Sequence, residues 1–233
     1  ELGLSEPASD HQRFAMAAYW RGMAHEEYGE LHLGFPGYFA LAPVDVDRVN
    51  INFVVPRSVM DGSRGDLEGF YRHHLMANPR LRERLQRAEL VGKVRATGPM
   101  ARRCKGTVAP GAILIGDAAE FVDPFTGEGL FIALRSAEMA DQAIAAGQVG
   151  SLDGRRAEEF GMKLKMCWTL QRYLYHPRLA NFVLHRLAAN PVLADRMVAM
   201  TGDYVPPEEV MTPGFYLGLF NPLASWRTGY AAG

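Results

Sequence analysis

The sequence predicts an α+β fold in which an antiparallel sheet comes first, one strand–turn–helix unit follows, and helices form the C-terminal region. Two observations lead to this prediction. Short apolar runs fill residues 13–56 with no helix between neighbouring runs, which is typical of an antiparallel sheet with one solvated or ligand-facing side. After residue 127, apolar residues recur mainly at helical spacing.

Four neighbouring runs predict the strands of this sheet, at residues 13–21, 27–34, 37–43 and 48–56. The last run is the clearest, because Val49, Ile51 and Phe53 alternate with Asn50 and Asn52, so that one face is apolar and the other polar. The Val-Asp-Val-Asp segment before it suits a hairpin connection. A further strand is expected at residues 90–97.

Two short helices are expected between the last two of these strands. A loop rich in glycine and aspartate ends at Asp66, whose side chain can cap a helix that runs to about residue 77. Asn78 and Pro79 end that helix, and Pro79 suits the first position of a second one. Leu81 and Leu85 are expected to face the core.

A different pattern begins at residues 112–115, a run that is apolar on both faces. It predicts a strand of a parallel, fully covered sheet that leads directly into Asp117. A helix is expected over residues 127–146, with Gly147 as its C-terminal cap. Three more helices are expected over about residues 153–175, 178–189 and 192–200, the first capped by Asp153, and the proline-rich tail is expected to form only short turns.

Composition and charge exclude several classes of function. The chain has 233 residues and a formal net charge of −1, so neither nucleic acid nor an anionic membrane is an expected partner. No apolar run approaches the ~18 residues of a membrane span, and stable membrane insertion is not expected. Cys104 and Cys167 cannot form a disulfide framework, which favours a cytoplasmic setting. No group of side chains has metal-ligand spacing.

Residues 116–130 read Gly-Asp-Ala-Ala-Glu-Phe-Val-Asp-Pro-Phe-Thr-Gly-Glu-Gly-Leu and carry the chemistry of the chain. The carboxylate of Asp117 follows a predicted strand, where ligands of α/β sheets bind, and can accept two hydrogen bonds from a diol. The small residues Ala118 and Ala119 let the backbone bend close to a ligand. Gly127 and Gly129 open a helix whose unpaired N–H groups and positive dipole end suit an anion, or a ring that becomes anionic.

This segment resembles the second FAD motif of the para-hydroxybenzoate hydroxylase-like flavoproteins, which include group A monooxygenases, flavin-dependent halogenases and geranylgeranyl reductases. The resemblance implies that Asp117 binds the ribityl chain and that the turn at Pro124 borders the isoalloxazine. It also implies that the backbone from Thr126 to Gly129 faces flavin N1 and O2. Glu120 stands where the family often has a small residue, so its side chain is expected to point away from the pyrophosphate.

The resemblance therefore predicts a set of cofactor-binding residues and no metal site. The set consists of Gly116, Asp117, Ala118, Pro124, Thr126, Gly127, Glu128 and Gly129. The cofactor is FAD, with NADH or NADPH as the expected reductant. No catalytic acid or base is expected, because in this family the flavin does the chemistry while the protein positions the substrate and excludes water.

The resemblance covers most of the chain and implies its organisation. Residues 1–98 correspond to a substrate-domain sheet with a helical insertion, residues 99–147 to the last strand and helix of a Rossmann-type FAD-binding domain, and residues 148–233 to a helical C-terminal region. The family's Gly-x-Gly-x-x-Gly sequence and its aspartate–glycine motif are absent, and the sequence starts without an initiator Met. We expect the C-terminal portion of a protein nearly twice as long, inactive by itself.

One strand separates the branches of this family. Halogenases carry Trp-x-Trp-x-Ile-Pro and geranylgeranyl reductases Tyr-x-Trp-x-Phe-Pro where this chain has Tyr-Phe-Ala-Leu-Ala-Pro at residues 38–43. The missing tryptophans disfavour halogenation. If the strand lines a substrate pocket, Ala40 and Ala42 widen the pocket beside Tyr38 for a bulkier substrate. The alternative is that the alanines pack beneath another strand.

The resulting hypothesis is part of an FAD-dependent oxidoreductase that acts on a small organic substrate, by monooxygenation or by alkene reduction. The alternative is a non-catalytic remnant that acts as a binding or oligomerisation module. An unpaired edge at residues 112–115 would favour pairing with another copy, so a homodimer is the expected self-association.

Overall fold

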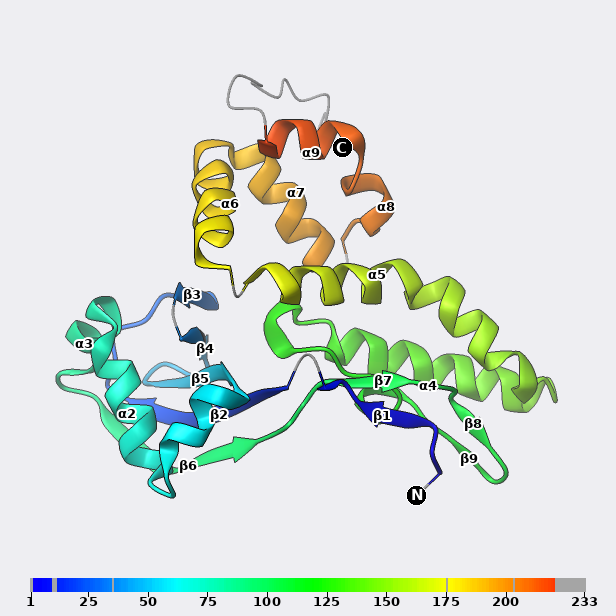
Figure 1. The fold of residues 1–233 in the computed structure, drawn as a ribbon, viewed down its shortest axis with the longest axis horizontal. Helices are drawn as coiled ribbons and strands as arrows, with labels where there is room; N and C mark the ends of the chain where they lie inside the picture. The colour runs from blue at the N-terminus through cyan, green and yellow to red at the C-terminus, as the bar shows by residue number, and fades with distance from the viewer. Residues whose placement is uncertain (1, 10–11, 35, 175, 203, 221–233) are drawn as a thin grey trace. The chain divides into compact units, whose positions relative to one another are not determined.

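The computed structural model describes residues 2–9, 12–34, 36–174, 176–202 and 204–220 (Figure 1). The chain divides into two compact units, of which one is Pro7–Ala101 and the other consists of the segments before and after it. Each unit has a hydrophobic core of its own. The α+β architecture predicted from the sequence is confirmed.

The first unit is built on a five-stranded sheet with the order β3-β4-β5-β2-β6. Its strands are β2 (Arg13–Arg21), β3 (Glu30–Gly34), β4 (Gly37–Pro43), β5 (Arg48–Pro56) and β6 (Glu89–Thr97). All neighbouring strands are antiparallel, as predicted. The predicted bounds of β2, β4 and β5 are confirmed, because a period of two is easiest to recognise in strands with one buried face.

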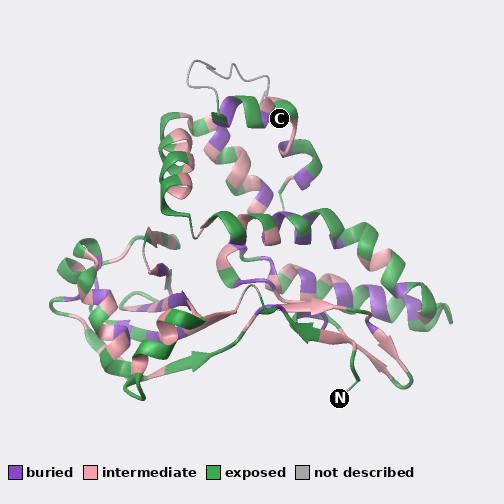
Figure 2. Cartoon of the chain, in the orientation of Figure 1, coloured by how far each residue is buried: buried purple, intermediate pink, exposed green. Residues whose placement is uncertain are grey.

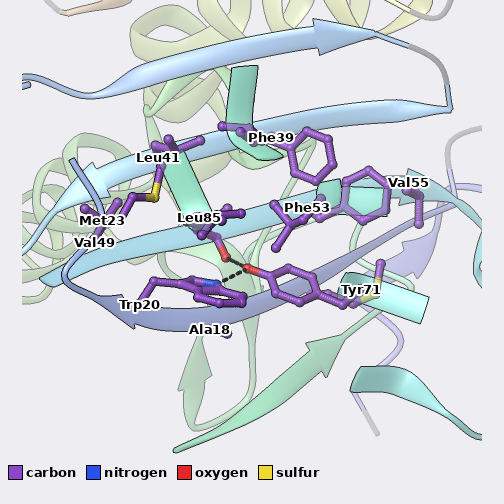
Figure 3. Close-up of a cluster of buried hydrophobic side chains, with 14 residues drawn as sticks. Ala18, Trp20, Met23, Phe39, Leu41, Val49, Phe53, Val55, Tyr71 and Leu85 are labelled. Carbon is purple, nitrogen blue, oxygen red and sulfur yellow. Dashed lines mark hydrogen bonds between the residues drawn. The ribbon is translucent and has the colours of Figure 1, made fainter. Parts of the chain in front are cut away.

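One face of this sheet forms the core of the unit, shown in Figure 3. The buried residues of this face are Met16, Ala18, Trp20, Phe39, Leu41, Val49, Ile51, Phe53 and Val55. Phe39 and Phe53 are opposite each other in register, and their rings stack with centroids 4.3 Å apart. The alternation that predicted β5 therefore separates the face packed against the helices from the opposite face.

Helices pack on this apolar face, and the Asp66 cap and the first-position Pro79 are those that the sequence predicts. They are α1 (Arg57–Met60), α2 (Leu67–Ala77) and α3 (Pro79–Leu85). Asp66 caps α2 by accepting a hydrogen bond from the Gly69 N–H at 2.8 Å. Asn78 accepts from two N–H groups of α3. Leu81 and Leu85 are buried, as predicted. The helix α1 was not expected, and the predicted loop after it begins with a 3₁₀ turn, η2 (Asp61–Ser63).

The prediction of a parallel strand at residues 112–115 is wrong. The second unit contains the pair β1 (Ser5–Pro7) and β7 (Arg102–Cys104), and the hairpin β8 (Val108–Ala109) and β9 (Ala112–Ile113). β9 pairs antiparallel with β8, and Asp117 lies in a 3₁₀ turn, η3 (Gly116–Ala118). A parallel pair needs a crossover connection of a dozen or more residues, and the two residues between β8 and β9 allow only an antiparallel hairpin.

The helix expected over residues 127–146 is α4 (Gly129–Ala145). Figure 2 shows buried residues along one side of it. These are Ile132, Ser136, Met139, Ala140 and Ala143. On another side Leu130 and Leu134 are 80% and 74% exposed.

The C-terminal region consists of α5 (Leu152–Leu174), α6 (Pro177–Ala189), α7 (Pro191–Thr201), α8 (Pro207–Val210) and α9 (Pro213–Phe220), with a short 3₁₀ turn η5 (Val149–Ser151) before α5. The first three were predicted. The expectation of short turns only in the tail is wrong up to residue 220, because a proline suits the first helical position and opens both α8 and α9. Pro222 lies outside the described residues. In the part of the chain that the structure describes, no helix combines the length and hydropathy of a membrane span.

The prediction that Asp153 caps α5 is also wrong. The helix begins one residue earlier, at Leu152. The Asp153 Oδ1 atom instead accepts hydrogen bonds from the N–H and the Oγ1 hydroxyl of Thr107, at 2.7 and 2.6 Å. Asp153 thus fixes the chain just before β8 onto α5.

Candidate functional site

The segment with the FAD-like motif, residues 116–129, is called the candidate loop below. It begins at Gly116, whose φ of 51° lies in the left-handed region that favours glycine. A Cβ atom at Gly116 would lie 3.0 Å from the Cβ atom of Ala133 in α4, and the Gly116 N–H donates to the Ser136 hydroxyl at 3.0 Å. The lack of a side chain therefore lets the start of the loop pack against α4.

Asp117 presents its carboxylate at the surface of this unit. It is an exposed residue, and none of the described residues donates a hydrogen bond to its carboxylate. Partial burial alone raises its pKa above the ordinary value. A Cβ atom at Gly129 would lie 3.6 Å from Asp117 Oδ1, so this glycine keeps the space beside the carboxylate open. The carboxylate can accept hydrogen bonds from hydroxyl groups of a ligand.

The second half of the candidate loop turns the chain into α4. Pro124–Thr126 form a 3₁₀ turn, η4, in which the Asp123 carboxylate accepts from the Phe125 N–H at 2.9 Å. Gly127 follows with a φ of 75°, which a residue with a side chain rarely adopts. The Ile132 N–H bonds the Glu128 carbonyl at 3.0 Å, so the N–H groups of the first turn before it have no acceptor within the helix.

Side chains of α5 hold the buried side of the loop. Lys163 Nζ donates to Glu128 Oε2 at 3.0 Å, and both side chains are buried. Burial raises the pKa of Glu128, an effect that Lys163 partly offsets. Thr126 Oγ1 and Cys167 Sγ form a hydrogen bond at 3.3 Å, and burial raises the pKa of Cys167 to about 11.

The middle of the loop is held by a cluster around Glu120. Its Oε2 atom accepts from both terminal nitrogens of Arg156 at 3.2 Å, and its Oε1 atom accepts from Trp168 Nε1 at 3.0 Å. The Arg103 guanidinium lies 3.9 Å from the centroid of the Trp168 ring. The Glu120 side chain thus points toward α5. Sequence reasoning missed these partners, because residues so far apart share no spacing signal.

The second predicted group, Tyr38, Ala40 and Ala42, lies on β4 in the other unit, on the sheet face opposite the helices. Tyr38 is buried, Ala40 is half-buried and Ala42 is exposed. Ala40 lies between Leu31 of β3 and Asn52 of β5 in register, and Ala42 lies beside Asn50.

The same face continues onto the neighbouring strands. Ala15 and Ala17 of β2 pair with Val54 and Asn52 of β5. Asn52 Nδ2 donates to Asn50 Oδ1, so these two polar side chains of β5 form one pair. Small side chains therefore flank a hydrogen-bonded asparagine pair at the centre of the sheet.

Two further features of the described residues narrow the chemistry. A cavity of about 10 Å³, whose lining includes Thr107, Ser136 and Phe160, has room for roughly one water molecule and not for an organic ligand. No group of three or more His, Cys, Asp or Glu residues that could hold a metal ion occurs in the described ranges.

No protein-family model matches the chain. It is 27% identical over 179 residues to the flavin-dependent halogenase ptaM of Pestalotiopsis fici, a match that covers 67% of the chain and 33% of that protein. It is 26% identical over 157 residues to a tryptophan 2-halogenase of Chondromyces crocatus, covering 64% of the chain and 30% of that protein.

Solved structures with a similar fold come from the same group of flavoproteins. The flavin-dependent brominase Bmp2 matches 85% of the chain and 52% of its own with a TM-score of 0.71 at 19% identity. A flavoprotein/dehydrogenase from Cytophaga hutchinsonii matches 89% of the chain and 53% of its own, with a TM-score of 0.73 at 18% identity. A geranylgeranyl bacteriochlorophyll reductase-like protein from Thermoplasma acidophilum has a TM-score of 0.57.

The matches cover about a third of each curated relative, and about half of each of the first two structures. Within these shares, the chain has the fold of FAD-dependent halogenases and related flavoproteins. The resemblance inferred from the motif at residues 116–130 is confirmed at this level.

Proposed function

We propose that this chain is part of an FAD-dependent oxidoreductase that acts on a small organic substrate, and that the candidate loop holds the ribityl and ring portion of the FAD. One observation carries the proposal. The exposed Asp117 carboxylate, which the described residues leave without a donor, lies beside Gly129 at the start of α4. Residues that match an FAD motif thus bring together a hydrogen-bond acceptor and a helix N-terminus. None of the described residues donates to this acceptor, and the first N–H groups of the helix have no acceptor within it.

The groups in this arrangement fit the chemistry of a flavin. The Asp117 carboxylate can accept hydrogen bonds from ribityl hydroxyls, and the first N–H groups of α4 can donate to ring oxygens. The 17-residue helix directs the positive end of its dipole at the same place, which favours the negative charge that a flavin ring gains on reduction. FAD supplies the redox chemistry when bound, and the chain supplies binding and orientation.

We assign the substrate to the sheet face that carries Ala40 and Ala42 beside the buried Tyr38. Small apolar side chains of β2 and β4 lie around the pair of Asn50 and Asn52, which offers hydrogen bonds to a ligand. A substrate for this face would be broad and largely apolar, with at least one polar group.

Three reactions compete within this proposal: monooxygenation, alkene reduction and halogenation. The sequence of β4 favours monooxygenation or alkene reduction, because it lacks the tryptophans of the halogenase pattern. The names of the two curated relatives favour halogenation. NADH or NADPH would be the source of electrons in each case.

The test is flavin binding by the protein expressed from its complete reading frame. Asp117→Ala should weaken FAD binding, whereas Asp141→Ala, which removes an exposed carboxylate from the same region, should not. Incubation with an organic substrate panel, NADH or NADPH, oxygen and bromide, followed by mass spectrometry, separates added oxygen, added hydrogen and added halogen. A parent protein that binds no FAD would refute the proposal and favour a non-catalytic binding module.

A further inference from the structure

A buried ion pair lies directly beneath the turn that opens α4. Lys163 Nζ is 3.0 Å from Glu128 Oε2, and the two side chains are only 8% and 4% exposed. The ammonium group also lies 4.2 Å from the centroid of the Phe131 ring. Lys163 therefore contacts Glu128, the residue just before α4, and Phe131 in the first turn of the helix.

Stability alone gives a poor reason for this pair. Removing two charges from water costs as much as their attraction returns, so a buried pair rarely stabilises a fold more than apolar residues would. The second oxygen of the Glu128 carboxylate, Oε1, is buried, and none of the described residues donates a hydrogen bond to it. The pair thus keeps a desolvation cost that its hydrogen bond does not fully offset.

A second contact ties the same turn to the same helix. Thr126, two residues before Glu128, shares a hydrogen bond with Cys167 at 3.3 Å. Lys163 and Cys167 are four residues apart in α5, so their side chains lie on one face of it. Both ends of the Thr126–Glu128 turn are therefore anchored on one helical face.

We propose that Lys163 is a positioning residue for the flavin, one that sets the Thr126–Gly129 backbone through Glu128 and neutralises the carboxylate next to it. The proposal rests on the function proposed above. An uncompensated carboxylate at this helix N-terminus would oppose the negative charge of a reduced ring, and the Lys163 ammonium removes that conflict.

The inference predicts a pH dependence when Lys163 is removed. In Lys163→Met the group that lowers the Glu128 pKa is gone, so more of the carboxyl group is neutral in mild acid than in mild base, and the turn should lose its geometry as the pH rises between them. The ionisable groups around this site are Glu128, Lys163, Cys167, Asp123 and, four residues before Lys163 on α5, Glu159. Cys167 has a pKa of about 11 and stays neutral through that range, and Asp123 is common to all variants.

The experiment compares four forms of the protein expressed from its complete reading frame. They are the parent, Lys163→Met, the charge-balanced Lys163→Met/Glu128→Gln, and the control Arg135→Met/Glu159→Gln. The control removes a 2.8 Å ion pair that also joins α4 to α5 and whose Glu159 interacts electrostatically with Lys163, so it changes the charge around Lys163 without replacing Lys163 or Glu128. FAD affinity is measured at about pH 6 and about pH 9, and amide hydrogen exchange is followed over residues 123–131.

We expect Lys163→Met/Glu128→Gln to exchange faster at the turn and to bind FAD about tenfold more weakly at either pH, the loss typical of a charge-assisted hydrogen bond. Lys163→Met should match it at the lower pH and lose more affinity at the higher. The control should resemble the parent. A double variant with unchanged turn exchange and unchanged affinity overturns the role of Lys163, as does an equal loss in the control. A parent that binds no FAD refutes the proposed function instead.

Discussion

Tyr71 offers a direct test of how the sheet unit is held together. Its side chain is fully buried between the sheet and α2, and its hydroxyl group makes two hydrogen bonds there (Figure 3). It donates to the Ile51 carbonyl at 2.8 Å and accepts from Trp20 Nε1 at 3.3 Å. Tyr71→Phe removes this oxygen and keeps the ring, so the packing of the core changes little.

The expected loss follows from the group that is left behind. The Trp20 N–H would stay buried without an acceptor, which costs about 1–3 kcal/mol. The hydrogen bond to Ile51 contributes about 1 kcal/mol more, and relaxation of the core returns part of the total. We therefore expect the free energy of unfolding to fall by about 2 kcal/mol, or Tm by roughly 10 °C for a unit of this size.

Urea unfolding followed by circular dichroism measures this difference. Tyr19→Phe is the matched control, because Tyr19 lies on the same strand as Trp20 with 46% of its surface exposed and should change stability by less than ~0.5 kcal/mol. Combining Tyr71→Phe with Trp20→Phe should cost less than the sum of the single changes, since both partners are then gone. A Tyr71→Phe variant as stable as the control would refute this account of the core.

The remaining predictions concern the cofactor and the substrate. Asp117→Ala should weaken FAD binding by about tenfold or more, with little change in Tm, as measured by flavin titration and thermal melting. Because burial raises the Asp117 pKa, the folded state binds its proton more tightly than the unfolded state does. Asp117→Asn should then stabilise the apo protein slightly at neutral pH and lose that advantage below the ordinary pKa of 3.8, and an advantage that grows in acid would contradict the sign. Ala40→Trp or Ala42→Phe should narrow the range of accepted substrates, and unchanged turnover on every substrate would remove β4 from the pocket. The 233-residue chain alone should bind FAD weakly, because it has no Gly-x-Gly-x-x-Gly sequence for the ADP portion, and sub-micromolar binding in a fluorescence titration would contradict this.

The elements that the sequence predicts well are those whose signals are local. β5 alternates apolar residues with asparagines, and α2 and α3 begin after Asp66 and Asn78, whose side chains satisfy the first N–H groups of each helix. Such signals need no knowledge of the rest of the fold. The two glycines at the start of α4, Gly127 and Gly129, are a local signal of the same kind.

The elements that the sequence misses depend on distant partners. The run at residues 112–115 is apolar enough for a parallel strand, yet strand direction is set by the neighbours, and here the neighbour is β8. Lys163 reads as one of several charged residues on an ordinary amphipathic helix, and only the fold brings it to Glu128, 35 residues away in the sequence. Neither the direction of this strand nor the contact between Lys163 and Glu128 can be predicted from a short stretch of sequence.

The alternation along β4 has a consequence for how this protein can be diversified. Phe39 and Leu41 face the packed core, whereas Ala40 and Ala42 face the opposite side of the same strand. A mutational library restricted to Ala40 and Ala42 would reshape that side of the strand without replacing the core residues Phe39 and Leu41. Selection for new ligands could thus proceed on one side of a single strand while the other side preserves the scaffold.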